Sequence, residues 1–358
     1  MEPRAPQASP PVASARGGTA RYPAAPALPA RTRILHMVLQ LWRDAAATPP
    51  PSRDDARARF VYGLQQPLLG VRLLLRDRDL LGLALAPAAL LAIVCAIAAA
   101  GSMEVRAAHG PSWWSLGLAG LEGSAMFVIA FFTTFAALAP VPPFLFARHY
   151  ARLAARARNA LGLGPRIPWL KSLSQSIGET VAQVVVLTFG LLPLTLPLAL
   201  LGATGALVAF VAQLLWTMHW IVVESLDNGR TLAPGEDVAE VTKAELVVAD
   251  TPWFARPIHG VRHERARRWL APVRGFTEIM ESLVRGWSPE LRLVERERAL
   301  SAGFGLGAFV LLAIPGVNLL FRPALVVAAA HLRGQLEREH ALEAEAEALA
   351  AVDYAGGS

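Results

Sequence analysis

Hydrophobic and polar positions follow one another along this chain in long blocks. The first long apolar block, 80–101, holds 22 residues without a charged side chain. A helix needs about 20 such residues to cross the ~30 Å hydrocarbon core of a bilayer at 1.5 Å per residue. We therefore predict a transmembrane helix over 80–101.

Two further apolar blocks follow the first. Residues 123–147 contain several phenylalanines and predict a second long span. The block 180–223 is long enough for two passes, and His219 is its only ionisable side chain. A small-residue run at 201–205 predicts the turn of an apolar helical hairpin over this block.

The last apolar block, 299–330, is interrupted by Pro315 and Gly316 and contains Arg322. As a helix, 299–314 reaches only about 24 Å, which is short of a full crossing. We therefore favour a re-entrant broken helix pair that dips into the membrane and returns. A single crossing helix over 299–321 is the alternative.

The polar segments divide the rest of the chain. The membrane core is expected over 80–223. Around it we predict a disordered Pro/Ala/Arg-rich tail over 1–32, amphipathic interfacial segments over 33–79, a cytoplasmic polar insert over 224–298, and an acidic amphipathic helix with its tail over 331–358.

Composition narrows the class of protein. Hydrophobic residues make up 54% of the chain and charged residues only 17%, against about 25% in a soluble domain. Mean hydropathy is +0.40. A single cysteine, Cys95, rules out a disulfide scaffold. We expect an all-α integral membrane protein with two long transmembrane helices, a hairpin and a re-entrant pair, surrounded by interfacial amphipathic helices.

The basic residues predict how the chain is oriented. Lys and Arg number 34, and the link 102–122 between the first two spans has only Arg106. Because Lys and Arg are retained on the cytoplasmic side, only this link is expected to face outward, with the N-terminus in the cytoplasm. The basic clusters lack regularly interleaved aromatic residues, so nucleic-acid binding is not expected.

Four polar side chains near the ends of apolar blocks are candidate substrate ligands. Arg76 and Arg78 precede the first span, and a guanidinium offers paired donors that match an oxyanion. Contact with lipid headgroups is the alternative for both. Asn318 follows the helix break, where it either faces a dissolved ion or caps the chain. Arg322 either lies in a substrate pathway through the membrane or reaches the lipid headgroups.

Several short motifs resemble the CysZ-type sulfate permease family, which also includes the etoposide-induced membrane proteins. The strongest is the run 314–320, IPGVNLL, followed by Pro323 and the alanines 328–330. The motif residues that carry the resemblance here and elsewhere are Phe60, Gly63, Leu80, Pro87, Pro143, Phe144, Gly303, Phe304, Gly305, Pro315, Asn318 and Pro323.

The resemblance implies a multi-pass protein of the bacterial inner membrane that passes sulfate. The family's permeases carry a Pro-Gly-Leu-Arg turn before the first span, and its arginine is tied to sulfate. The matching positions here, 78–81, read Arg-Asp-Leu-Leu, so Arg76 and Arg78 are the nearest substitutes. The insert of roughly 230–289 is also longer than the family's connection.

Two functions follow from these patterns. The first is a permease or channel for a small oxyanion, sulfate by the resemblance. The second is a non-transporting membrane organiser whose insert and tails bind partners. We expect contact with membrane lipid and a small inorganic anion. A homo-oligomer is expected because half-penetrating helices leave backbone groups for other protein to satisfy. No enzyme activity, cofactor or metal site is predicted.

Overall fold

The computed structural model describes residues 29–108, 146–247, 250–261, 263, 268–312 and 318–356. These residues are mainly helical, and two short strands are present. The elements are α1 (Ala30–Arg43), α2 (Ala56–Arg76), α3 (Arg78–Ala108), α6 (Ala147–Ala160), β1 (Ile167–Pro168), α7 (Leu173–Phe189), α8 (Leu192–Ala199), α9 (Gly202–Asn228), β2 (Thr231–Leu232), α10 (Val238–Val247), α11 (Arg256–His259), α13 (Ala271–Val284), a 3₁₀ turn (Arg285–Trp287), α14 (Ser288–Arg296), α15 (Arg298–Leu312) and α16 (Asn318–Gly356).

Within the described residues, three helical stretches are long and apolar enough to cross a membrane. They are Arg78–Gly101 in α3, Leu173–Leu198 in α7 and α8, and Gly202–Asn228 in α9. The first coincides with the predicted span and the other two with the predicted hairpin, which begins earlier and ends later than expected. The chain turns just before Gly202, whose φ of +75° favours glycine. These stretches are compatible with an all-α membrane protein.

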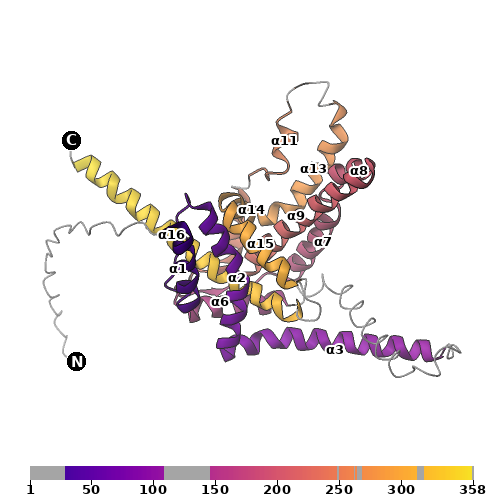
Figure 1. The fold of residues 1–358 in the computed structure, drawn as a ribbon, viewed down its shortest axis with the longest axis horizontal. Coiled ribbons are helices and arrows are strands. Elements are labelled where there is room, and N and C mark those ends of the chain that lie inside the picture. Colours follow the sequence, from indigo (N-terminus) through magenta and orange to yellow (C-terminus); the bar gives the residue numbers. More distant parts are fainter. Residues whose placement is uncertain are drawn as a thin grey trace, which may run out of the picture.

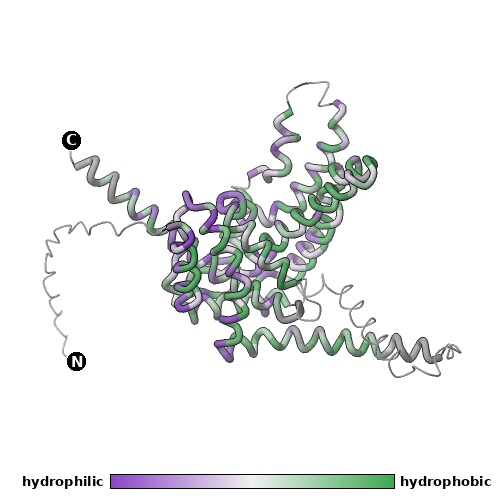
Figure 2. Tube along the Cα trace, viewed as in Figure 1, coloured by the Kyte–Doolittle hydropathy of each residue, from purple (hydrophilic) through white to green (hydrophobic). Residues whose placement is uncertain are grey.

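Helix α3 extends away from the helical body (Figure 1), and Figure 2 shows hydrophobic residues along its middle part. Its base is packed, since Leu80 and Ala84 are buried. Farther along, Leu90, Ile93 and Ile97 are each more than half exposed. An exposed apolar face of this kind needs lipid or another protein to cover it. The predicted second span, 123–147, lies almost entirely outside the described residues, as does most of the 1–32 tail.

Helix α2 packs at the centre of the body against α15 and α16, and its expected position in the headgroup plane stays a prediction. Its Tyr62, Gln66 and Leu69 are fully buried. Glycines permit this placement, because the glycine hydrogen is the only side chain that fits where two helix backbones touch. A Cβ on Gly63 would lie 2.0 Å from a backbone oxygen of α15. The helix is therefore enclosed by protein on the face that carries Gln66.

Helix α15 lies alongside α2 and runs in the same direction. A Cβ on Gly303 would lie 2.0 Å from the carbonyl oxygen of Phe60, and one on Gly307 would lie 2.6 Å from that of Leu64. The residue numbers therefore increase in the same direction along both helices, which makes the two helices parallel. Gly303 and Gly307 therefore allow the backbones of α2 and α15 to pack closely.

Helix α16 runs in the opposite direction along α2. Near its start Ala324 lies against Gly70, whereas farther on Glu339 forms an ion pair with Arg59. Arg59 also pairs with Glu297, immediately before α15. The chain therefore leaves Arg59 along α15 and comes back to it along α16. This reversal is the geometry that a re-entrant pair over 299–330 requires, and its depth in a membrane stays a prediction.

The C-terminal segment does not form a separate amphipathic helix at 331. Helix α16 is continuous from Asn318 through this point, with Pro323 inside it. Leu332 and Leu336 are buried in the main core. The acidic residues beyond Leu336 predict a surface helix. The apolar residues at the start of this segment, Leu332 and Leu336, are instead part of the core of the body.

The polar insert 224–298 is divided between the body and its periphery. Helix α9 extends into it as far as Asn228, and β2 pairs antiparallel with β1. Helix α14 contributes Leu291 and Val294 to the main core. The insert therefore helps to build the core, while α11 and part of α13 project away from it (Figure 1).

Candidate functional site

The structure places the four predicted ligands in different surroundings. Arg76 and Arg78 are exposed at the junction of α2 and α3, and neither forms an ion pair with a described residue. Asn318 is the first residue of α16, and its side chain lies outside the described part. Arg322 lies one turn farther along the same helix and is partly buried against α9.

Arg322 forms a polar cluster with residues of two candidate spans. Its Nη1 donates to Glu224 Oε1 at 2.9 Å. The second oxygen of Glu224 accepts a hydrogen bond from Gln183 Nε2 at 2.6 Å. The cluster joins α16, α9 and α7, which are far apart in the sequence. Arg322 and Glu224 retain 28% and 19% side-chain exposure, so both are reachable from solvent.

The pair borders a small cavity of about 50 Å³. Tyr150 is one of its lining residues, and burial raises the pKa of this side chain to about 12, so the phenol stays protonated at neutral pH. The remaining lining residues are Ile221, Ser225, Asn228, Leu312, Leu325 and Val326. The Nε and Nη2 of Arg322 have no hydrogen bond to a described residue, so the guanidinium retains donors for an anion.

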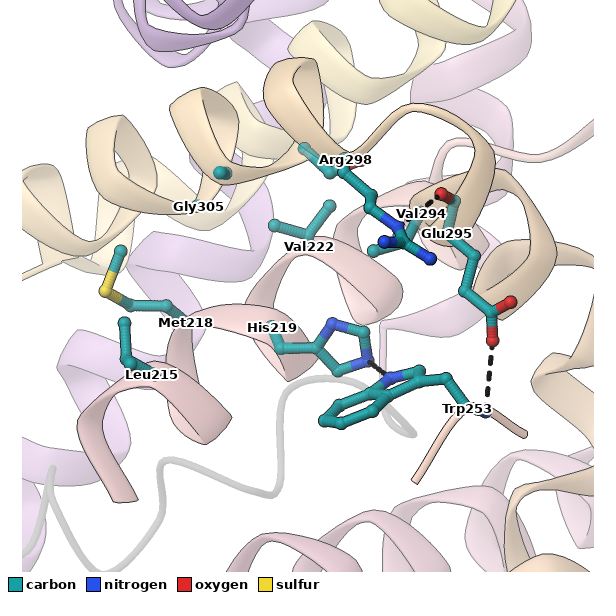
Figure 3. A pocket seen from close by; sticks show the side chains of 11 residues that line it. Leu215, Met218, His219, Val222, Trp253, Val294, Glu295, Arg298 and Gly305 are labelled. Carbon is teal, nitrogen blue, oxygen red and sulfur yellow. Dashed lines mark hydrogen bonds between the residues drawn. The ribbon is translucent and has the colours of Figure 1, made fainter. Parts of the chain in front are cut away.

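A second, larger cavity of about 420 Å³ lies on another face of α9, next to α14 and α15 (Figure 3). Its walls are mainly apolar and its polar groups are few. It is lined by Leu215, Met218, His219, Val222, Trp253, Val294, Glu295, Arg298, Ser301, Ala302 and Gly305. Size and lining both match those of small-molecule sites in proteins.

Most polar groups of the larger cavity are already partnered. Trp253 Nε1 donates to His219 Nε2 at 3.4 Å, which leaves the imidazole in the form that accepts at this nitrogen. Glu295 accepts from the Trp253 backbone at 3.0 Å and pairs with Arg256 at 2.8 Å. Arg298 differs: its Nε donates to the Glu295 backbone oxygen, and its guanidinium forms no ion pair with a described residue.

A buried charge network lies where α9 meets the insert, and the sequence analysis did not identify it. Lys171 Nζ lies 2.6 Å from carboxylate oxygens of both Glu179 and Asp227. Burial alone would lower the pKa of Lys171, but the two carboxylates outweigh it and raise this pKa. Arg230 pairs with Glu245 and stacks 3.7 Å over the Trp169 ring.

This network ties segments together and makes no contact with Arg322. Its members come from the loop before α7, from α7 itself, from the end of α9 and the residues after it, and from helix α10. A lysine or arginine in a polar loop gives no sequence signal that separates a buried pair from a lipid contact. Replacing Lys171 would leave the carboxylates of Asp227 and Glu179 without the ammonium group that they share. A structural role explains its geometry without a ligand.

The residues that carried the family resemblance fall into two groups. Phe304 is fully buried, and Gly305 faces α9, where a Cβ would lie 3.0 Å from Val222. Pro143, Phe144 and Pro315 lie outside the described residues. Comparisons of this chain with family models, with curated proteins and with solved structures find no match.

Proposed function

We propose that this protein is a permease or channel for a small oxyanion, sulfate by the motif resemblance. In this proposal α3 and the α7–α9 hairpin cross the bacterial inner membrane, while α15 and the start of α16 dip into it and return. The N-terminus is cytoplasmic, and copies of the chain associate to cover the exposed apolar surface of α3 and the backbone of the half-length helices.

The observation that supports this proposal best is the position of Arg322. It is the only charged residue in the apolar block 299–330. Charged side chains in such segments are rare and usually mark an ion or substrate pathway. Arg322 also borders a cavity, next to the point where α15 ends and α16 begins, and helix ends inside a membrane favour ions.

Glu224 gives this site a mechanism of selection. The carboxylate occupies one guanidinium nitrogen of Arg322, so an entering anion must compete with it. A tetrahedral oxyanion offers several acceptor oxygens to the remaining N–H donors of the Arg322 guanidinium. A compact monovalent anion matches these donors less well. In this proposal Glu224 stands in for the anion in the resting state, and the Arg322–Glu224 hydrogen bond supports that role. Arg76 and Arg78, exposed at the surface, attract anions only weakly in this scheme.

Sulfate flux into proteoliposomes tests the proposal. We expect Arg322→Gln to reduce the rate about tenfold or more, because a hydrogen bond to a charged group contributes about 1.5–3 kcal/mol and each 1.4 kcal/mol is a factor of ten. Arg76→Gln is the matched control and is expected to change the rate less than twofold. Absence of sulfate flux in the wild type, or equal flux in the Arg322 variant, would refute the proposal.

Cysteine labelling tests the proposed topology. In a Cys95→Ala background, Ala351→Cys near the end of α16 is expected to resist a membrane-impermeant maleimide in intact cells and to react after permeabilisation. Arg106→Cys, in the link expected outside, is the positive control. Labelling of Ala351→Cys in intact cells would show that 299–330 crosses the membrane instead of returning.

A second candidate function is a membrane organiser without transport. It is favoured by apolar side chains that the insert leaves in solvent: Trp269 is 86% exposed and Val247 81%. Such residues on a polar segment are typical of partner-binding surfaces. This function would be preferred if the flux assay found no transport by folded, reconstituted protein.

A further inference from the structure

We propose that the 420 Å³ cavity between α9, α14 and α15 is a binding site for an anionic phospholipid. The phosphate would lie at Arg298, and an acyl chain would lie on the apolar wall formed by α9. The site is separate from the Arg322 cavity and does not depend on transport.

The shape and lining of the cavity select an amphiphile. Its volume falls within the range of about 300–1,000 Å³ typical of ligand sites, whereas a bare inorganic anion needs far less room. Leu215, Met218 and Val222 form an apolar wall along one face of α9, and Val294 of α14 closes it. Figure 3 shows the Arg298 side chain at the same cavity, near Glu295 and Trp253.

The charges of the side chains that line the cavity favour an anionic ligand. Three titratable side chains face this cavity: His219, Glu295 and Arg298. His219 accepts a hydrogen bond from Trp253, and the charge of Glu295 is balanced by Arg256. Arg298 is left as an uncompensated cation among the described residues. The cavity therefore carries about one net positive charge, which complements one phosphodiester.

The cavity opens onto surface that is suited to lipid. Leu207, Val211 and Leu215 follow one another at four-residue intervals on α9 and are 63%, 45% and 59% exposed. Leu215 itself lines the cavity, so this exposed apolar stripe leads directly into it. An acyl chain can therefore follow α9 from outside the protein to the cavity.

Aromatic side chains mark the level at which a headgroup would lie. Trp253 lines the cavity, and its ring centroid is 6.3 Å from that of Trp216 and 5.9 Å from that of Phe254. Tryptophan is enriched at the membrane–water interface, where its ring sits at the level of the headgroups. Arg298 lies beside this cluster, as a phosphate ligand at that depth must.

Lipid titration of the full-length detergent-solubilised protein, followed by native mass spectrometry, tests the site. The probe is palmitoyl-oleoyl phosphatidylglycerol, with the zwitterionic phosphatidylcholine of the same chains as comparison. We expect the first phosphatidylglycerol to bind at least tenfold more tightly than phosphatidylcholine. Arg298→Gln should remove most of this preference.

Two variants separate the site from general effects. Ala302→Trp fills the cavity from an exposed position of α15 without changing charge, and it should weaken binding of both lipids. Arg296→Gln removes an arginine two residues away that pairs with Glu343 at 3.6 Å and does not line the cavity; it should leave the preference intact. Equal losses in the Arg296 and Arg298 variants would overturn the proposal. So would full competition by millimolar inorganic phosphate, which would identify a free anion as the ligand.

Discussion

Replacing Gly303 by alanine is expected to destabilise the protein by about 3 kcal/mol, the upper end of the cost of overpacking a core. The added Cβ would lie 2.0 Å from the carbonyl oxygen of Phe60 and 2.8 Å from the backbone nitrogen of Leu64. Both are backbone atoms of α2, so no side chain can rotate to make room. Helices α2 and α15 must move apart, which opens the centre of the body. Thermal unfolding of the purified protein in detergent measures the loss.

The control variant for this prediction is expected to change stability in the opposite direction. Gly275 lies inside α13, and a Cβ there would meet nothing within 4 Å. Gly275→Ala is expected to stabilise the protein by about 0.5–1 kcal/mol, because alanine loses less conformational freedom than glycine in a helix. If both variants shift the midpoint in the same direction, backbone contact between α2 and α15 is not what Gly303 provides.

Replacing Arg59 by methionine is expected to cost about 3–5 kcal/mol, the range measured when one partner of a buried ion pair is removed. Arg59 is 3% exposed and pairs with Glu297 and Glu339, and its Nε donates to the Pro51 carbonyl oxygen at 2.8 Å. Methionine fills a similar volume. It leaves Glu297, itself 2% exposed, with only the more exposed Arg53, whose Nε lies 3.3 Å from Glu297 Oε1. Chemical denaturation in mild detergent gives the free energy of unfolding.

Two further variants show whether charge or packing is responsible. Arg57→Met changes an exposed arginine two residues away on α2 and is expected to change stability by less than about 0.5 kcal/mol. The double variant Arg59→Met with Glu297→Gln is expected to recover part of the loss, because it no longer buries a carboxylate that has lost its buried cation. A double variant no more stable than Arg59→Met alone would contradict this account.

The sequence by itself determined where the long apolar helices lie. The blocks 80–101 and 180–223 predict helices that the structure shows, although the hairpin begins earlier and ends later than its block. The reason is that only a helix satisfies every backbone group within an apolar stretch of that length. The glycines at 303–307 also indicate close helix packing, because such packing needs small residues at that spacing. These features depend on residues near one another in the chain, so a linear pattern contains them.

Only the tertiary structure decided which polar side chains are buried and with what partner. Arg156 and Arg158 lie two positions apart on α6 and look alike in the sequence. Arg156 is exposed and pairs with Asp79 at the surface, whereas Arg158 is 1% exposed and pairs with Glu337 at 2.6 Å. The same holds for Arg322, whose partner Glu224 lies 98 residues away. An arginine is stable either in water or beside a carboxylate, so its own position does not reveal which. That choice is made when helices distant in sequence pack together and bring the partner within reach.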